Sequence, residues 1–224
     1  MDSILTNIKI SVNKKLFNKD PESSELGKKI LSNSIELIND LGFDSFTFKK
    51  LGERIGSNES SVYRYFDNKH KLLIYLTSWY WGWMEYRLLL ATVSISDPKH
   101  KLRTALNIIS DDIVEDNGFE HINECYLQQI IINESSKSYL TKEVDAENKE
   151  GYFLVYKRVV RRISEMIKEV NPNYIYPASL ASTAVESVLH QNFLRNHFLS
   201  ITDCNKTTHP RDFVIDLVFN NLNK

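Results

Sequence analysis

The stretch with the most suggestive chemistry is residues 56–73, GSNESSVYRYFDNKHKLL. It carries hydroxyl groups at Ser60, Ser61 and Tyr63, and a guanidinium group at Arg64. Side chains of these types donate hydrogen bonds to phosphate oxygens and to the edges of bases. The stretch therefore indicates binding to an anionic partner rather than catalysis.

Two short helices must position these side chains. The first is expected over residues 48–55, and Gly56 ends it as a C-terminal signal. Asn58 then caps a second helix over residues 59–66. Gly52 is unusual inside a helix, and its missing side chain would let another helix approach closely.

Two short helices joined by a glycine-containing turn predict a helix-turn-helix. In that motif the second helix lies in the major groove of DNA, and its N-terminal residues meet the base edges. Ser60 and Ser61 are small enough to let the backbone approach DNA, and the positive end of the helix dipole favours phosphate. Asn68 caps a third, long helix, and Lys69 places an ammonium group at its start.

The region around this motif resembles the TetR family of bacterial transcriptional regulators. The resemblance covers about residues 26–76, and its specific part is the spacing of Thr47, Gly56, Tyr63, Phe66 and Lys69. It is carried by the helix end before Gly42-Phe43, Phe46-Thr47-Phe48, Leu51-Gly52, Ile55-Gly56, Val62-Tyr63-Arg64-Tyr65-Phe66, Asn68-Lys69 and Leu72-Leu73.

The motif departs from the family pattern at five positions. Ser57 replaces an apolar residue, Asn58 replaces a Ser or Thr cap, Ser60 stands where Gly is common, and Tyr65 stands where His is common. Glu59 is acidic on the expected DNA face, where it could accept a hydrogen bond from cytosine N4 or simply favour the helix dipole. These departures bear on the DNA sequence preference and leave the expected fold unchanged.

The resemblance implies a set of DNA-contacting residues. Thr47, Tyr63, Tyr65 and Lys69 would contact phosphates, Ser60, Ser61 and Arg64 would face bases, and Lys49, Asn58 and Glu59 complete the set. The alternative is that the two tyrosines are half-buried packing residues and that the lysine at the helix start is merely solvated.

The whole chain reads as all-α, with about nine helices and no convincing pair of strands. A helical pattern from about residue 140 to 170 has a weak point at Gly151. We expect an N-terminal arm over residues 1–20, a helix-turn-helix domain over 21–76, and an effector-binding and dimerisation domain over 77–224. A long helix would join the two domains, and lysines of the arm would follow the DNA backbone or minor groove.

All three tryptophans fall within five residues, and Trp79 and Trp83 share one face of a helix. We interpret them as the wall of an apolar ligand pocket, with core packing as the alternative. The effector would act by binding one dimer geometry better than the other. The candidate pocket residues are Trp79, Trp83, Tyr126, Tyr152 and Tyr156.

The last two expected helices, residues 177–198 and 210–222, would form a four-helix bundle across a two-fold axis, as the resemblance implies. The final helix carries about two apolar residues per turn, more than a lone surface helix needs, although core packing within one chain is the alternative. A two-fold dimer would match a palindromic operator. The candidate interface residues are Val185, Leu189, Phe193, Phe213 and Leu217.

Charge and cysteine usage add weaker constraints. Residues 1–76 hold 12 Lys and Arg against 10 Asp and Glu, a bias too small to indicate nucleic acid by itself. Cys125 and Cys204 are far apart, which favours free thiols in a reducing cytoplasm, and no apolar run is long enough for a membrane span. The basic run at residues 157–162 indicates a solvated helix face or, alternatively, part of a pocket for an anionic effector.

These features predict a ligand-responsive transcriptional repressor that binds a palindromic operator as a homodimer and is released by a small molecule. The alternative is an all-α small-molecule or acyl-binding protein, or an enzyme, with a vestigial helix-turn-helix. The sequence lacks the GxGxxG, P-loop, HExxH and GxSxG motifs, so we expect no enzymatic activity and no cofactor. His121, Glu124 and Cys125 share one helix face but lack further ligands, so we expect no metal site.

Overall fold

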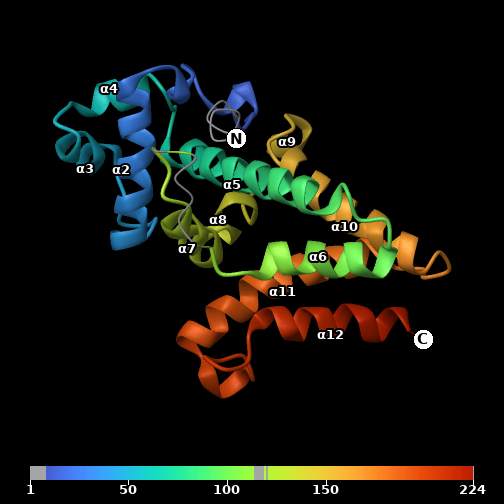
Figure 1. The fold of residues 1–224 in the computed structure, drawn as a ribbon. Helices are drawn as coiled ribbons and strands as arrows, with labels where there is room; N and C mark the ends of the chain where they lie inside the picture. The colour runs from blue at the N-terminus through green and yellow to red at the C-terminus, as the bar shows by residue number, and fades with distance from the viewer. Residues whose placement is uncertain (1–8, 114–118, 120, 224) are drawn as a thin grey trace. The chain divides into compact units, whose positions relative to one another are not determined.

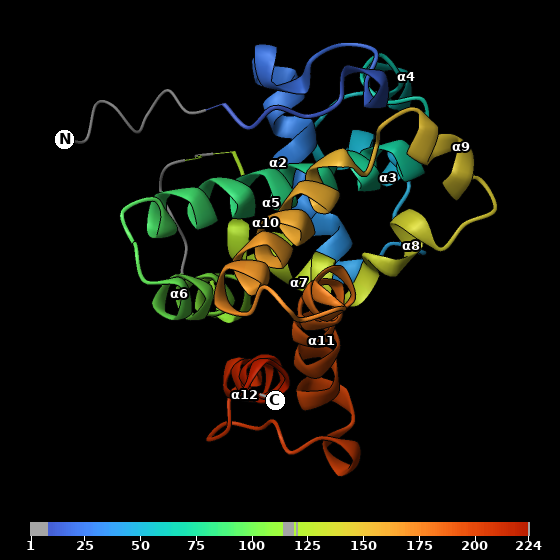
Figure 2. The ribbon, with the colours of Figure 1, turned by 90° about the vertical axis from the view of Figure 1, so that its right-hand side faces the viewer.

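The computed structural model describes residues 9–113, 119 and 121–223 of the 224-residue chain, and within them it is all-helical without strands. The expected all-α fold is confirmed, as Figures 1 and 2 show. The α-helices are α2 (Glu25–Leu41), α3 (Phe48–Arg54), α4 (Glu59–Tyr63), α5 (Lys69–Thr92), α6 (Pro98–Ser110), α7 (Glu124–Glu134), α8 (Ser136–Tyr139), α9 (Val144–Lys149), α10 (Leu154–Val170), α11 (Pro177–His197) and α12 (Pro210–Leu222).

The described helices number eleven rather than about nine because weak helical stretches are interrupted. The pattern from residue 140 to 170 is the clearest case, since it breaks at Gly151, whose φ of 82° lies in the left-handed region. The break separates α9 from α10. The weak point in the sequence is therefore the place where one helix ends and the chain starts another.

The chain forms two compact units, and each combines segments that are distant in sequence. Unit 1 comprises Met1–Gly82 and Ile113–Leu154, and unit 2 comprises Trp83–Asp112 and Val155–Lys224. The boundary between them falls within α5. The functional division at residue 76 remains a prediction.

The core of unit 1 is built around α2, which packs against α3 and α7. Its buried face carries Ile30, Leu31, Ile35 and Ile38, the helical stripe that the sequence shows. Burial of such side chains contributes roughly 1.5–3 kcal/mol each, so this face anchors the short helices that could not stand alone.

The N-terminal segment is part of unit 1 from residue 9 onward. Leu16 is fully buried, and Ile10 and Val12 are also buried. The backbone N–H of Asn18 donates to the carbonyl of Tyr65 at 2.8 Å. Residues 9–20 are thus held in the fold rather than extended as an arm, and residues 1–8 lie outside the described part of the chain.

Asn18 ties this segment to the end of the helix-turn-helix. Its side-chain amide donates to Asp67 Oδ1 at 2.7 Å and to the carbonyl of Tyr63 at 3.4 Å. We expect Asn18→Ala to lower the free energy of unfolding by about 1 kcal/mol, the usual net value of an exposed hydrogen-bonded pair. Urea unfolding would measure it, with Asn196→Ala, an exposed residue of α11, as the control expected to change stability by less than about 0.5 kcal/mol. Equal effects of the two variants would contradict the prediction.

Unit 2 is a helical layer in which α6 packs on α11 and α12, and α11 packs on α12. Leu106 of α6, Val188 of α11 and Val218 of α12 are buried in its core. The α10 helix adds a buried stripe that includes Val159 and Ile163.

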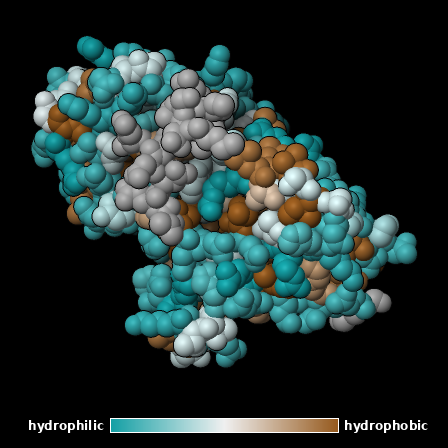
Figure 3. Space-filling model, in the orientation of Figure 1, coloured by the Kyte–Doolittle hydropathy of each residue, from teal (hydrophilic) through white to brown (hydrophobic). Residues whose placement is uncertain are grey.

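In the described part of the chain no helix combines the length and apolarity that a membrane crossing requires. Hydrophilic side chains cover much of the face drawn in Figure 3.

Candidate nucleic-acid interface

The two short helices of the motif begin where the sequence predicts. Thr47 Oγ1 accepts a hydrogen bond from the backbone N–H of Lys50 at 3.2 Å, which caps α3. Asn58 Oδ1 accepts from the backbone N–H of Ser61 at 2.9 Å, which caps α4. Each cap satisfies a backbone donor that a helix start leaves without an intrahelical partner.

Two glycines set the distance and direction between α3 and α4. A Cβ atom on Gly52 would lie 3.1 Å from the carbonyl carbon of Asn58 and from the carbonyl oxygen of Ser57. The predicted reason for a glycine here, close approach of another helix, is therefore confirmed. Gly56 has a φ of 66°, which turns the chain out of α3 toward α4.

The outer face of the motif presents hydrogen-bonding groups to solvent. Lys49 and Arg64 are exposed, and neither makes a side-chain hydrogen bond or ion pair with the residues that the structure describes. The hydroxyls of Ser60 and Ser61 donate to Asn58 Oδ1 at 2.7 and 2.8 Å, which leaves their lone pairs free to accept. Both cations are thus available to an anionic partner.

Tyr63 is 47% exposed and its ring packs edge-on against Phe48 at a centroid distance of 5.0 Å. This packing fixes the direction of the ring. Partial desolvation, the nearby charge of Glu59 and a hydrogen bond with that carboxylate raise the pKa of the phenol above its ordinary value. The hydroxyl group donates to the Glu59 carboxylate in this structure, so a phosphate would have to replace that carboxylate as its acceptor.

Tyr65 does not lie on this outer face. It is 2% exposed, and its hydroxyl group is hydrogen-bonded to Ser24 Oγ at 2.8 Å. Ser24 is the cap of α2, so the contact joins the end of the motif to the start of that helix. The alternative considered from the sequence, a packing role, describes Tyr65 in this structure.

Lys69 is also turned inward. Its ammonium group donates to the carbonyl oxygens of Phe43, Asp44 and Phe46 at 3.0, 3.1 and 3.2 Å. An ammonium group has three N–H donors, so these contacts occupy all of them. In this structure Lys69 holds the turn that precedes α3 and has no donor left for a phosphate.

Two residues of unit 1 that the sequence analysis missed hold the same turn. The backbone N–H of Phe43 donates to Glu134 Oε1 at 2.9 Å. Lys137 pairs with both Glu134 and Asp44 at 2.8 Å. No local pattern could have indicated the contacts with Phe43 and Asp44, because about ninety residues separate them from Glu134 and Lys137.

We expect Lys69→Met to lower the free energy of unfolding by about 1–2 kcal/mol. Methionine keeps the apolar contact with the Phe43 ring, but it leaves three carbonyls without their donor. Urea unfolding would measure the loss. Lys49→Met is the matched control, because this exposed lysine should leave stability within about 0.5 kcal/mol of the wild type. A Lys69 variant as stable as the Lys49 variant would show that the turn does not depend on the ammonium group.

The five candidate pocket residues do not share one environment. Trp79, Trp83 and Tyr152 are buried, and Trp79 Nε1 donates to Glu22 Oε1 at 3.1 Å. Tyr126 is exposed, and the Tyr156 hydroxyl donates to Glu186 at 2.6 Å. They are divided between the two units, and the two pockets described within unit 2 are lined by other residues. Their joint role as a pocket remains a prediction.

The candidate dimer residues divide in the same way. Val185 and Leu189 are buried inside unit 2, so they offer little surface to a second chain. Phe193 and Leu217 are half-buried, and Phe213 is exposed. The end of α11 and the turn after it add exposed apolar side chains that the sequence analysis did not single out, namely Phe198, Leu199 and Ile201.

Comparison with known families identifies the motif. Residues 30–76 match the family model described as bacterial regulatory proteins, tetR family. Over this region the chain is therefore similar to the TetR family. The match spans the part of α2 from Ile30, both short helices and the start of α5, which are the elements that position the exposed donors.

Solved structures extend the likeness to the fold of most of the chain. AibR in complex with isovaleryl coenzyme A and operator DNA is 18% identical, with a TM-score of 0.58 over 86% of this chain and 98% of that one. The TetR-family transcriptional regulator PfmR from Thermus thermophilus is 14% identical, with a TM-score of 0.55 over 87% and 97%. The superantigen PfiT is 15% identical, with a TM-score of 0.56 over 90% and 97%.

At these identities the structural likeness establishes the fold alone. The proteins that share this fold are described with different roles. No curated protein matches the sequence. Within the described residues, no group of three or more His, Cys, Asp and Glu side chains is arranged to hold a metal ion.

Proposed function

We propose that this protein is a TetR-family transcriptional repressor that binds a palindromic DNA operator as a homodimer and is released by a small molecule. The observation that carries the proposal is the outer face of α3 and α4. There Lys49 and Arg64 are exposed beside the hydroxyl groups of Ser60, Ser61 and Tyr63. The helix caps Thr47 and Asn58, together with Gly52 and Gly56, fix the positions of the two helices.

The proposed DNA contacts follow from exposure. Lys49, Tyr63 and the hydroxyl group of Thr47 would bind phosphates, which set the register of the protein on the duplex. Arg64 and the serine hydroxyls would reach base edges in the major groove. Asn58 and Glu59 would lie at the start of the recognition helix. Tyr65 and Lys69 would stabilise the helix-turn-helix without contacting DNA directly.

The proposed dimer rests on the apolar surface at the end of unit 2. Phe198, Leu199, Ile201 and Phe213 are exposed, and the rings of Phe193 and Phe198 pack at a centroid distance of 5.9 Å. Exposed apolar groups close together on a surface mark interaction sites, and Phe198, Leu199 and Ile201 follow one another closely in the turn after α11. A two-fold pairing there would present two recognition helices to two half-sites.

The test is a fluorescence anisotropy titration of the purified chain with promoter DNA from beside its own gene, at several salt concentrations. We expect tight binding to a palindromic segment, a fall in affinity with rising salt, and two chains per DNA in sedimentation. Equal affinity for the segment and for a scrambled sequence would contradict the proposal. It would favour the alternative, a small-molecule-binding protein with a vestigial motif.

A further inference from the structure

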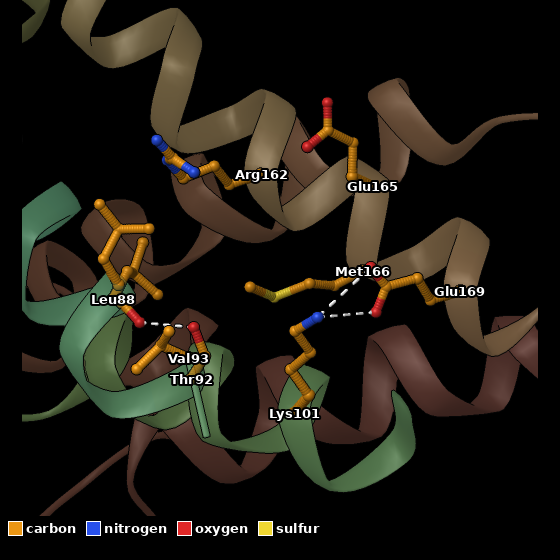
Figure 4. A pocket seen from close by; sticks show the side chains of 9 residues that line it. Leu88, Thr92, Val93, Lys101, Arg162, Glu165, Met166 and Glu169 are labelled. Carbon is orange, nitrogen blue, oxygen red and sulfur yellow. Dashed lines mark hydrogen bonds and ion pairs between the residues drawn. The ribbon is translucent and has the colours of Figure 1, made fainter. Parts of the chain in front are cut away.

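A groove in unit 2 lies along the ends of α5 and α10 and the start of α6, with a volume of about 270 Å³. Its lining includes the apolar side chains of Leu89, Val93 and Met166, with Leu88 buried behind them. Figure 4 labels Leu88, Val93 and Met166. Its rim carries charged groups, and the two cations are Lys101 and Arg162. A groove of this volume is near the lower end for small-molecule sites and suits a ligand of modest size.

The charges beside the groove do not cancel, because of a buried carboxylate next to it. Glu85 accepts hydrogen bonds from Arg158 Nε at 3.1 and 3.0 Å, from Arg158 Nη2 at 2.7 Å and from Arg162 Nε at 2.9 Å. One carboxylate thus holds two guanidinium groups, which leaves one positive charge in excess. Burial alone would raise the pKa of Glu85, but the hydrogen bonds from both arginines outweigh it and lower the pKa.

The excess charge faces the groove through Arg162. Only Nε of this side chain is bonded to Glu85, and its terminal nitrogens make no hydrogen bond to the described residues. A guanidinium group presents such nitrogens as a planar pair that fits a carboxylate.

The acidic groups on the rim do not offset this charge. Lys101 Nζ pairs with Glu169 Oε2 at 3.0 Å, so these two groups neutralise each other. Glu165 is 62% exposed and its carboxylate lies 3.9 Å from Arg161 Nε, so solvent and that guanidinium weaken its field.

We propose that this groove binds a small amphipathic carboxylate, with the carboxylate on Arg162 and the hydrocarbon part on Leu89, Val93 and Met166. If the proposed function is correct, this carboxylate is the effector. Only its role as effector rests on the proposed function, whereas its binding to the groove does not. The hydrophobic floor supplies affinity in proportion to the apolar area covered, and the guanidinium supplies the preference for an anion.

Isothermal titration calorimetry with octanoate, octanol and octylamine tests the charge preference, because the three probes share one chain length. We expect octanoate to bind one per chain and at least ~10-fold more tightly than either other probe. Arg162→Gln should lower octanoate affinity at least ~10-fold. Lys168→Gln is the matched control, since this cation of the same helix is exposed and lies outside the groove lining.

A second variant keeps the test decisive if Arg162→Gln disturbs Glu85. Val93 is 80% exposed, so Val93→Trp should fold normally while filling the groove, and it should abolish octanoate binding. Octylamine binding as tightly as octanoate, or unchanged octanoate affinity in Val93→Trp, would overturn the site.

Calorimetry needs no DNA, so failure of this site and failure of DNA binding are seen separately. If octanoate binds the groove of a chain that binds its operator but does not weaken that binding, the site stands and its role as effector site falls.

Discussion

Operator binding is expected to fall at least ~100-fold when Arg64 is replaced by glutamate. Arg64 is exposed directly after α4 and makes no hydrogen bond or ion pair with the described residues. Loss of a direct contact to a base or phosphate costs about 1–3 kcal/mol, and the new negative charge adds repulsion from the DNA backbone. Anisotropy titrations of the operator at fixed salt would measure the change.

Arg161→Glu is the matched control for this experiment. It makes the same change of charge on an exposed helix of unit 2, outside the proposed interface, and should change operator affinity less than ~3-fold. Equal losses in the two variants would mean that only net charge matters, and the assigned recognition helix would then be wrong. Both variants should unfold at the wild-type temperature, because neither arginine is buried.

Glu85→Ala is expected to cost unit 2 about 2–3 kcal/mol of unfolding free energy. The substitution removes the carboxylate that accepts hydrogen bonds from Arg158 and Arg162, and leaves two guanidinium groups close together without it. Breaking a fully buried ion pair costs about 3–5 kcal/mol. We expect less because both arginine side chains are more than a third exposed and retain water. Urea unfolding at neutral pH would measure it.

The same contact predicts a pH dependence with a definite sign. The pKa of Glu85 is lower in the folded chain than its ordinary value of 4.5, so its contribution is complete above that value. It is lost as the pH falls through the lower, folded pKa. The stability difference between wild type and Glu85→Ala should therefore shrink on acidification, while Glu165→Ala, at an exposed carboxylate, should change stability by less than about 0.5 kcal/mol at any pH. A difference that stays constant down to acid pH would contradict an ionised Glu85.

The helix-turn-helix was predictable because local rules govern it. Thr47 and Asn58 act as helix caps through their own side chains, and Gly52 and Gly56 act through the absence of one. Each signal involves neighbours only a few residues away, so one sequence is sufficient to detect it. The all-α fold and the family of residues 30–76 follow from the same kind of signal.

The inward roles of Tyr65 and Lys69 were not predictable in that way. Tyr65 meets Ser24, and Lys69 meets the carbonyls of residues 43–46, so their partners lie more than twenty residues away. A tyrosine or a lysine can serve equally well on a surface or in a packed site, because each has an apolar body and a polar tip. Only the packing of α2 and α5 decides between these roles.

The sequence by itself therefore determined the helices, their caps and the recognition motif, because those depend on short-range backbone hydrogen bonds and helical periodicity. The tertiary structure decided which side chains of the motif remain on the surface, available for the proposed DNA contacts. It also set Glu85 beside Arg158 and Arg162 next to an apolar groove, which sequence spacing did not show. The physical reason is that burial and charge balance depend on residues far apart in the chain, which only the packing of the helices brings together.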